Sequence, residues 1–309
     1  MKAVRVHEWG VPPTLDEVPA PTPRDGETLV RVEAAAVAHL DLTVAGGRFG
    51  FKPELPYVAG VEGCGTVVSS GSYEPGTRVM LRGGGLGLKR DGTWAEFVAT
   101  RGVAPLPAGL APELGATYFV PATTAYTALH DVARLGDWEN EVVLVAGAAG
   151  AVGSMVVQLA LRAGATVLGL ANDRSLPPGV ERVRPDDPQL ARDRPATLLV
   201  DTLGGAGLAE RSRWVRPGGR AVAIGYVTGT TVSLDLPNWL LEDVALLPVN
   251  MIRREDAARR HAPMLAELLA KGELTLDVEA FRLADAARAL QLLATGGLQG
   301  RAVLVPGLP

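Results

Sequence analysis

The stretch VLVAGAAGAVGSMVVQLALRAGATVLGLANDR at residues 143–174 decides the fold. A short apolar run meets a cluster of glycines and alanines, a long apolar segment of helical length follows, and a second apolar run comes after Gly164. This order predicts a strand, a tight turn, a helix and a second strand of a parallel sheet. The turn carries almost no side chains, and a pyrophosphate can approach the N–H groups at a helix start only where no Cβ intrudes.

The glycines of this turn have distinct expected roles in binding a dinucleotide. Gly150 is expected where the backbone touches phosphate, and Gly153 where the helix packs against the strand. Ala148 stands where the usual GxGxxG pattern has its first glycine, so the prediction depends on the strand before the turn and the helix after it. A tight turn without a ligand is the alternative. The residues expected to contact the cofactor here are Gly147, Ala149, Gly150, Ala151, Val152 and Gly153.

The end of the second strand indicates which dinucleotide binds. Enzymes that use NAD usually place an Asp or Glu there to hold the ribose 2′-hydroxyl. The corresponding residue here is Ala171, followed by Asn172, Asp173 and Arg174. Because no acid opposes a 2′-phosphate at Ala171 and an arginine is close, we predict NADPH, with Asn172 and Arg174 in its site. A register shift of one residue, or Asp173 at the ribose, would favour NADH, and Arg174 as a solvated loop charge is a further alternative.

Composition restricts the class of protein. The chain has 309 residues, 47% of them hydrophobic, and a net charge of −4, which is enough for two domains and a large core. It has no basic stripe, so we expect no nucleic-acid partner. No apolar run approaches the ~18 residues of a membrane span, and we expect no signal peptide. With one cysteine, Cys64, an intrachain disulfide is excluded, and a reducing cytoplasmic location is expected.

The pattern of predicted elements changes along the chain. The first third has short β-branched runs between Gly and Pro, typical of a small barrel or sandwich. From about Leu114, strands alternate with helices, which predicts an α/β fold with a doubly wound parallel sheet. After Ala171, five prolines exclude one long helix. We expect instead a short strand at residues 180–183, a short helix near Gln189, and an open adenosine end of the site.

Several motifs in order resemble those of one protein family. They are YVAGVEGCGTVV (57–68), DGTWAEFV (91–98), TTAYTAL (123–129), GAAGAVG (147–153), VDTLGG (200–205) and GGLQGRAVLVP (296–306). Together they resemble the medium-chain dehydrogenase/reductase superfamily, and within it the zinc-free quinone oxidoreductases and their enone-reducing relatives. The resemblance covers nearly the whole chain.

The resemblance implies a fold, separate roles for two domains, and an oligomeric state. A GroES-like β-barrel catalytic domain would come from residues 1–114 and 251–309, with a Rossmann cofactor-binding domain at residues 115–250 inserted between them. The active cleft would lie between the two domains, and homodimers are common in the family.

The resemblance also implies that no metal is used. Zinc-dependent members bind zinc through a Cys and a His, and the matching positions here are Ala38 and Val61. Glu62 alone makes a poor zinc site, and the four histidines show no ligand spacing. Alcohol oxidation needs a Lewis acid, so we expect acceptors that take hydride unaided, namely quinones and α,β-unsaturated carbonyls.

Candidate catalytic residues follow from the same comparison. Tyr126 and Thr124 match family residues near the substrate and the nicotinamide, with helix packing as the alternative for Tyr126. His39 and Asp41 lie beside the lost cysteine position, and His39 would donate a proton, unless the two form a structural loop pair. Some relatives place a proton-donating tyrosine in the next loop. This chain has Phe49 and Phe51 there, so a water molecule is the alternative donor.

The remaining site predictions concern the substrate wall and the cofactor. Phe49, Trp94 and Trp239 are predicted to form the wall, although Trp94 packing the barrel and Trp239 at a dimer contact are alternatives. Residues after later strands are predicted to contact the cofactor, namely Leu203, Gly225, Tyr226, Asn250, Met251 and Arg301.

The leading hypothesis is an NADPH-dependent reductase of quinones or enones, and a dedicated enoyl reductase has the same fold. A non-catalytic NADPH-binding sensor or structural protein is the second class of hypothesis. A zinc alcohol dehydrogenase is the third.

Overall fold

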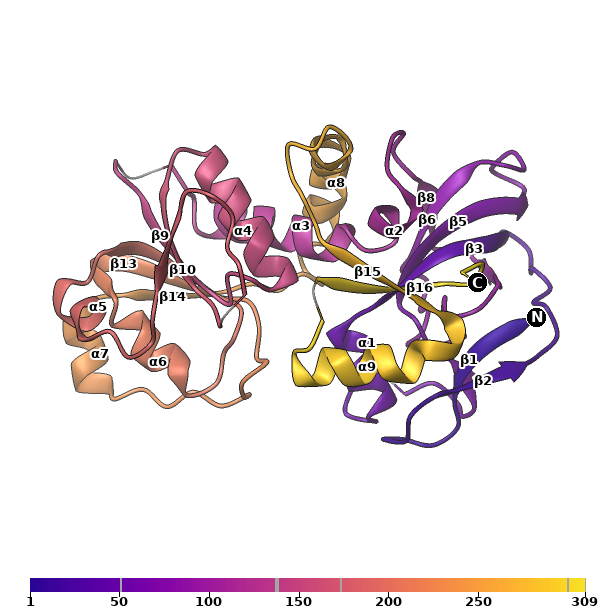
Figure 1. The fold of residues 1–309 in the computed structure, drawn as a ribbon, viewed down its shortest axis with the longest axis horizontal. Coiled ribbons are helices and arrows are strands. Elements are labelled where there is room, and N and C mark those ends of the chain that lie inside the picture. The colour runs from indigo at the N-terminus through magenta and orange to yellow at the C-terminus, as the bar shows by residue number, and fades with distance from the viewer. Residues whose placement is uncertain (51, 137–138, 173, 299, 309) are drawn as a thin grey trace. The chain divides into compact units, whose positions relative to one another are not determined.

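The computed structural model describes residues 1–50, 52–136, 139–172, 174–298 and 300–308. Its contacts divide the chain into two compact units, and most of their helices and strands are labelled in Figure 1. Unit 1 comprises Met1–Phe119, Leu269–Lys271 and Leu276–Pro309, and unit 2 comprises Val120–Leu268 and Gly272–Thr275.

Unit 1 is built on two sheets with a large apolar core and a smaller apolar cluster. The smaller sheet has the order β2-β1-β4, and the larger has the order β15-β16-β3-β5-β6-β8, with β7 also paired to β3. The strands are β1 (Lys2–Val6), β2 (Thr14–Glu17), β3 (Thr28–Val37), β4 (Tyr57–Val58), β5 (Glu62–Ser69), β6 (Arg78–Arg82), β7 (Phe97–Thr100), β8 (Val103–Pro105), β15 (Val278–Arg282) and β16 (Arg301–Val305). Its helices are α1 (His39–Ala45), α2 (Pro112–Gly115), the 3₁₀ turn η2 (Leu283–Asp285) and α9 (Ala286–Thr295).

The C-terminal strand joins the sheet of the N-terminal region. Residues of β16 pair antiparallel with β3, with Ala302 opposite Val37 and Leu304 opposite Ala35. These small and branched side chains are fully buried. Burial of their apolar surface therefore stabilises the pairing of β16 with β3. The segment Leu276–Pro309 therefore lies in unit 1 with the N-terminal strands.

Unit 2 contains a six-stranded sheet whose strands are all parallel, in the order β11-β10-β9-β12-β13-β14. Its strands are β9 (Val142–Ala146), β10 (Thr166–Leu170), β11 (Val180–Val183), β12 (Ala196–Asp201), β13 (Val215–Ala223) and β14 (Ala245–Pro248). The helices are α3 (Phe119–Tyr126), the π-helix η1 (Thr127–Val132), α4 (Ala151–Arg162), α5 (Pro188–Asp193), α6 (Gly207–Ser212), α7 (Leu236–Glu242) and α8 (Glu255–Ala270). The chain reverses its direction of winding next to β9, and ligands of such sheets bind at the carboxyl ends of the strands there.

Two local predictions for the proline-rich segment are confirmed. A strand occupies Val180–Val183, and a short helix occupies Pro188–Asp193. The Asp187 carboxylate caps this helix by accepting from the Gln189 N–H at 2.9 Å, and Pro188 fits its first turn because no N–H is needed there. Among the described residues, no helix is both long and apolar enough to cross a membrane.

Helix α8 belongs to a different unit from the one expected. Residues 251–268 were assigned with the C-terminal part of the first domain, but they lie in unit 2. The buried side chains of Ala258, Ala262 and Leu265 form the apolar face of α8. Its His261 also contacts the ring of Tyr126, which holds the helix against unit 2.

Candidate functional site

The turn after β9 is tied to the end of β10. The N–H groups of Gly147 and Ala148 both donate to the Leu170 carbonyl, at 2.9 and 3.0 Å. Gly147 has a φ of +81°, and a Cβ there would lie 2.3 Å from Thr202 Oγ1. Both the left-handed backbone and the lack of space require glycine at this position.

Gly150 and Gly153 differ in what a side chain would meet. A Cβ on Gly153 would lie 2.0 Å from the Gly147 carbonyl oxygen, so this glycine lets α4 pack closely on the turn. A Cβ on Gly150 would meet one protein atom within 4 Å, the same oxygen at 3.2 Å. Gly150 is also the N-cap of α4. Its absent side chain leaves the N–H groups of the first turn open to an anion.

The loop after β12 is organised by a buried ion pair that the sequence did not reveal. Asp201, which is 0% exposed, accepts from the N–H groups of Leu203 and Gly204 at 2.9 and 2.7 Å. Its other oxygen accepts from Arg211 Nε at 2.6 Å. A Cβ on Gly147 would lie 3.1 Å from a methyl carbon of Leu203. Leu203 therefore lies beside the glycine-rich turn.

Other predicted cofactor residues follow the carboxyl ends of β13 and β14. Gly225 approaches the Thr202 backbone so closely that a Cβ would lie 2.2 Å from its carbonyl oxygen. Tyr226 follows it and is 62% exposed. Asn250 caps the next turn, since its Oδ1 accepts from the Arg253 N–H at 3.1 Å, and Met251 is half-buried. Their contacts with a cofactor remain predictions.

The loop after β10 is held by an arginine that the sequence analysis missed. Strand β10 ends at Leu170, so Ala171 has the predicted position, while Asp173 lies outside the described residues. The Arg182 guanidinium donates to the carbonyls of Ala171 and Asn172 at 3.2 and 2.5 Å, and also to that of Arg174. The parallel pairing of β11 with β10 sets Arg182 opposite Gly169 and so directs it to this loop.

In unit 1, Asp41 links two backbone segments. Its Oδ2 accepts from the Ala38 N–H at 2.8 Å and its Oδ1 from the Val61 N–H at 3.1 Å. The side chain is buried, and Ala38 and Val61 are the two positions matched to zinc ligands in the sequence analysis. Because both oxygens are occupied by the backbone, the structure gives Asp41 a positioning role in place of the expected catalytic one.

The buried Asp41 carboxyl should make the stability of the protein depend on pH. Burial, with a further contribution from Glu62, raises its pKa from 3.8 to about 7. Between these values the folded state keeps a proton that the unfolded state releases, so the free energy of unfolding should fall as the pH rises from about 4 to 7.

We expect Asp41→Asn to remove this loss, which is at most about 4 kcal/mol. The measurement is urea unfolding at about pH 4.5 and about pH 7.5, with the exposed Asp25→Asn as the control. The same pH dependence in Asp41→Asn and in the unchanged protein would contradict the assignment.

His39 is the first residue of α1 and is exposed. Nearby atoms still desolvate its imidazole enough to lower the pKa, and the Arg301 guanidinium adds to that shift. A histidine with a lowered pKa is mostly neutral near pH 7, where its ring still has one N–H donor.

Arg301, expected at the cofactor, has its contacts inside unit 1. Its Nε donates to Thr117 Oγ1 at 2.6 Å, and its Nη2 donates to Glu62 Oε1 at 2.9 Å. Arg82 approaches the second oxygen of Glu62 at 3.5 Å. A buried carboxylate requires such partners, so the Arg301 guanidinium is used to neutralise Glu62 and the expected cofactor contact is corrected.

The donor atoms around Ala38 and Val61 do not fit a zinc ion. Both side chains are hydrocarbon, and the Glu62 carboxylate is already paired with two guanidinium groups. Within the described parts of the chain, no group of three His, Cys, Asp or Glu side chains is placed to hold a metal ion.

The predicted substrate wall is not assembled as expected. Trp94 is 0% exposed and its Nε1 donates to the Ala36 carbonyl at 2.9 Å, so it packs the core and cannot face a substrate. Phe49 is half-buried against the same core, and Phe51 lies outside the described residues.

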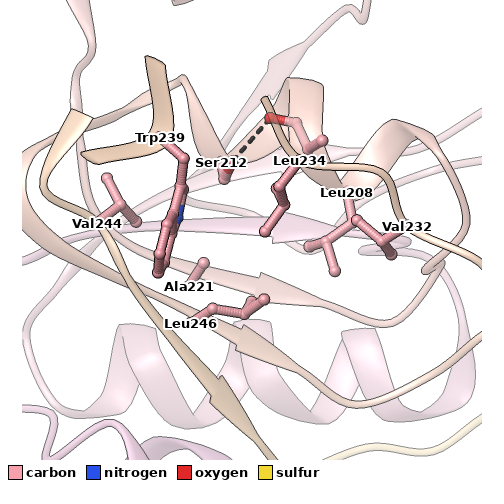
Figure 2. A pocket seen from close by; sticks show the side chains of 9 residues that line it. Leu208, Ser212, Ala221, Val232, Leu234, Trp239, Val244 and Leu246 are labelled. Carbon is pink, nitrogen blue, oxygen red and sulfur yellow. Dashed lines mark hydrogen bonds between the residues drawn. The ribbon is translucent and has the colours of Figure 1, made fainter. Parts of the chain in front are cut away.

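Trp239 contributes to an apolar pocket within unit 2 (Figure 2). The pocket is lined by Leu208, Ala209, Ser212, Ala221, Val232, Leu234, Trp239, Val244 and Leu246. Ser212 is the single hydroxyl among them, and it donates to the Ala209 carbonyl at 2.7 Å. No lining side chain is a charged group that would bind or activate a polar acceptor, so the pocket does not support the substrate role expected for Trp239.

Tyr126 lies between two imidazole rings. Its ring centroid is 4.3 Å from that of His130 and 4.6 Å from that of His261, and His261 Nε2 is 3.1 Å from Asp131 Oδ2. His130 and Asp131 lie on η1, the π-helix that directly follows Tyr126. The sequence analysis missed this cluster, because His261 comes from α8, far from Tyr126 in the chain. Thr124 is buried. The catalytic role of Tyr126 and the cofactor contact of Thr124 stay predictions.

Comparison with known proteins identifies the family. Residues 24–108 match a model of the alcohol dehydrogenase GroES-like domain, and residues 179–304 match a model of zinc-binding dehydrogenases. A zinc-type alcohol dehydrogenase-like protein of Schizosaccharomyces pombe is 36% identical over 215 residues, 66% of this chain and 64% of the relative. Prostaglandin reductase-3 of Bos taurus is 31% identical over 227 residues, 69% of this chain and 59% of the relative. The matches thus span about three fifths of these two relatives.

Two further matches cover a larger share of the relative's own length. The quinone oxidoreductase of Mus musculus is 30% identical over 249 residues, which are 73% of both chains. The solved structure of Escherichia coli quinone oxidoreductase complexed with NADPH has a TM-score of 0.82 at 20% identity, covers 99% of this chain and 100% of its own, and so shares the fold.

A parallel sheet with a glycine-rich turn, joined to a GroES-like unit, defines a two-unit fold of the dinucleotide-binding dehydrogenase type. The chain belongs to the medium-chain dehydrogenase/reductase superfamily, in its quinone oxidoreductase branch. The predicted family and fold class are confirmed.

Proposed function

We propose that this protein is an NADPH-dependent reductase that transfers hydride to a quinone or an α,β-unsaturated carbonyl without a metal ion. The observation that carries the proposal is the turn at Gly150, where the N-cap of α4 is a glycine and so places no side chain beside the first N–H groups of the helix. The names of the relatives, quinone oxidoreductase and prostaglandin reductase, support the class of acceptor. The NADPH in the Escherichia coli neighbour supports the cofactor.

The residues of unit 2 fit a dinucleotide. The N–H groups after Gly150 would donate to the pyrophosphate, and the positive end of the α4 dipole would favour its charge. Ala171 places no carboxylate where a 2′-phosphate would lie. When bound, NADPH supplies a hydride from C4 of its nicotinamide.

The chemistry of unit 1 restricts the acceptor. Ala38 and Val61 offer no metal ligands, so the acceptor must carry the negative charge that hydride addition creates on its own conjugated oxygen. That oxygen then needs a proton. We propose that His39, the exposed imidazole at the start of α1, donates it.

The variant His39→Asn should show whether a side chain supplies the proton. We expect kcat to fall by about 10- to 100-fold, because a general acid contributes at least this much. The decrease of kcat as the pH rises through the lowered pKa of His39 should also disappear. The exposed His7→Asn is the control. A pH profile of kcat identical to that of the unchanged protein would assign the proton to water.

The function itself is tested by binding and turnover. Purified protein is titrated calorimetrically with NADPH and NADH, and NADPH oxidation is then followed with a panel of quinones, enones and enoyl thioesters. The proposal requires NADPH binding and turnover with at least one acceptor. Tight NADPH binding without turnover on the whole panel would instead support a non-catalytic sensor, and binding of neither dinucleotide would refute the proposal.

We also propose a homodimer formed through the β14 edge of unit 2. Strand β14 is outermost in its sheet, and large apolar side chains are exposed on it and on α7. Leu240 is 65% and Leu241 is 81% exposed, and Leu246 on β14 is 37% exposed. Clustered apolar exposure of this kind is typical of protein interfaces, and an open strand edge pairs readily with a second copy.

The variant Leu241→Glu should convert the dimer to a monomer. A buried charge at an apolar interface costs several kcal/mol, enough to raise the dissociation constant by more than about 100-fold. Light scattering with size-exclusion chromatography gives the mass, and Val11→Glu, at an exposed apolar residue of unit 1, is the control. A monomeric mass for the unchanged protein would contradict the proposal.

A further inference from the structure

Arg182 is placed to do more than hold the loop after β10. Its side chain is exposed, and its three hydrogen bonds all go to backbone carbonyls, those of Ala171, Asn172 and Arg174. Carbonyls are neutral dipoles, so they orient the guanidinium without cancelling its charge. Among the residues that the structure describes, no carboxylate forms an ion pair with Arg182.

The hydrogen-bonding capacity of Arg182 is not exhausted by the loop. A guanidinium has five N–H donors, and at most three of them are used by the carbonyls. Within the described part of the chain, the remaining donors, including the Nε–H, have no further hydrogen-bond partner and can bind a second group. A guanidinium fork matches the oxygens of a phosphate, so Arg182 can hold the loop and a phosphate at the same time.

The location of Arg182 indicates which phosphate of the dinucleotide it would bind. The residues after the second strand of a dinucleotide-binding sheet contact the adenosine ribose, and here those residues are the ones whose carbonyls bind Arg182. Strand β11 fixes the arginine there, because Leu170 pairs with Val183 and Gly169 with Arg182. Ala171 itself places no carboxylate beside the guanidinium.

We propose that Arg182 is the residue that selects a dinucleotide with a 2′-phosphate over one without it. The inference rests on the proposed dinucleotide site, and it goes beyond the earlier assignment to Arg174 because the selecting charge comes from the neighbouring strand. The loop carbonyls hold the guanidinium in place before the ligand arrives, so little side-chain entropy is lost on binding.

The test measures the phosphate preference with fragments that need no redox chemistry. The full chain is titrated calorimetrically with 2′,5′-ADP and with 5′-AMP, in the unchanged protein and in Arg182→Gln, Arg182→Lys and Arg184→Gln. Arg184 is the matched control, because it is an exposed arginine two residues further along the same segment. Thermal unfolding of each variant shows whether it is folded.

We expect Arg182→Gln to lower the preference for 2′,5′-ADP by about tenfold or more, the range of a charged hydrogen bond. Its affinity for 5′-AMP should stay the same, Arg182→Lys should keep part of the preference, and Arg184→Gln should keep all of it. The preference of the unchanged protein should also fall with added salt.

Three results would overturn the inference. The first is an equal loss of affinity for both fragments in Arg182→Gln, which would mean that Arg182 shapes only the loop. The second is a full preference for 2′,5′-ADP retained in Arg182→Gln. The third is no preference for 2′,5′-ADP in the unchanged protein. The turnover assay keeps the two proposals apart. A preference that depends on Arg182, in a protein that reduces none of the acceptors, would support this inference and refute the proposed reductase.

Discussion

Replacing Gly153 by alanine is expected to destabilise unit 2 by roughly 3 kcal/mol and to weaken NADPH binding by more than about tenfold. The added Cβ would lie 2.0 Å from the Gly147 carbonyl oxygen and 2.8 Å from its carbon. Both are backbone atoms that cannot rotate away, so the helix or the turn must shift. The turn is tied to Leu170 by two hydrogen bonds, and a shift therefore breaks these bonds or moves the N–H groups of α4.

The measurements for Gly153→Ala are the urea midpoint and the calorimetric dissociation constant for NADPH. Gly150→Ala is the matched variant, because its Cβ would meet nothing closer than 3.2 Å. Alanine is a weaker N-cap than glycine, so Gly150→Ala should lose at most about 1 kcal/mol of stability. Its affinity for NADPH should nevertheless fall, because the added methyl group would meet the phosphate. A stable Gly153→Ala with normal affinity would refute the packing role, and normal affinity in Gly150→Ala would refute the phosphate site.

Replacing Asp201 by alanine is expected to cost about 3–5 kcal/mol of stability, the range for breaking a buried ion pair. Asp201 is fully buried and accepts from Leu203, Gly204 and Arg211. Its removal leaves the Arg211 charge without a carboxylate and two backbone N–H groups without an acceptor. The loop that carries Leu203 should then loosen beside the glycine-rich turn, so NADPH affinity should fall as well.

A double variant separates the ion pair from the loop hydrogen bonds. Arg211→Met alone leaves Asp201 buried and uncompensated, whereas Asp201→Ala with Arg211→Met removes both charges. We expect the double variant to be more stable than the sum of the two single effects by about 1–3 kcal/mol. Urea unfolding of all four proteins gives this coupling energy. Strictly additive effects would mean that the two side chains act independently.

The sequence by itself determined the parallel sheet of unit 2 and the position of its turn. Residues 143–174 contain strand, turn, helix and strand in consecutive order, so local apolar periodicity and glycine placement were sufficient. The prolines after Ala171 likewise excluded a long helix and predicted the short elements β11 and α5, because a proline restricts the backbone conformation of the residues next to it. The motifs of unit 1 and the tail were sufficient for the family, because their order along the chain is itself informative.

Only the tertiary structure decided what several candidate side chains do. Arg301 meets Glu62 across 239 positions of sequence, and Trp94 reaches the Ala36 carbonyl across 58. Arg182 reaches the β10 loop because two parallel strands are in register. Long charged and aromatic side chains take whichever partner the packed backbone brings within reach, and burial makes that partner obligatory. Their roles therefore follow from the assembled core, whereas the turn at Gly150 follows from residues that are adjacent in the chain.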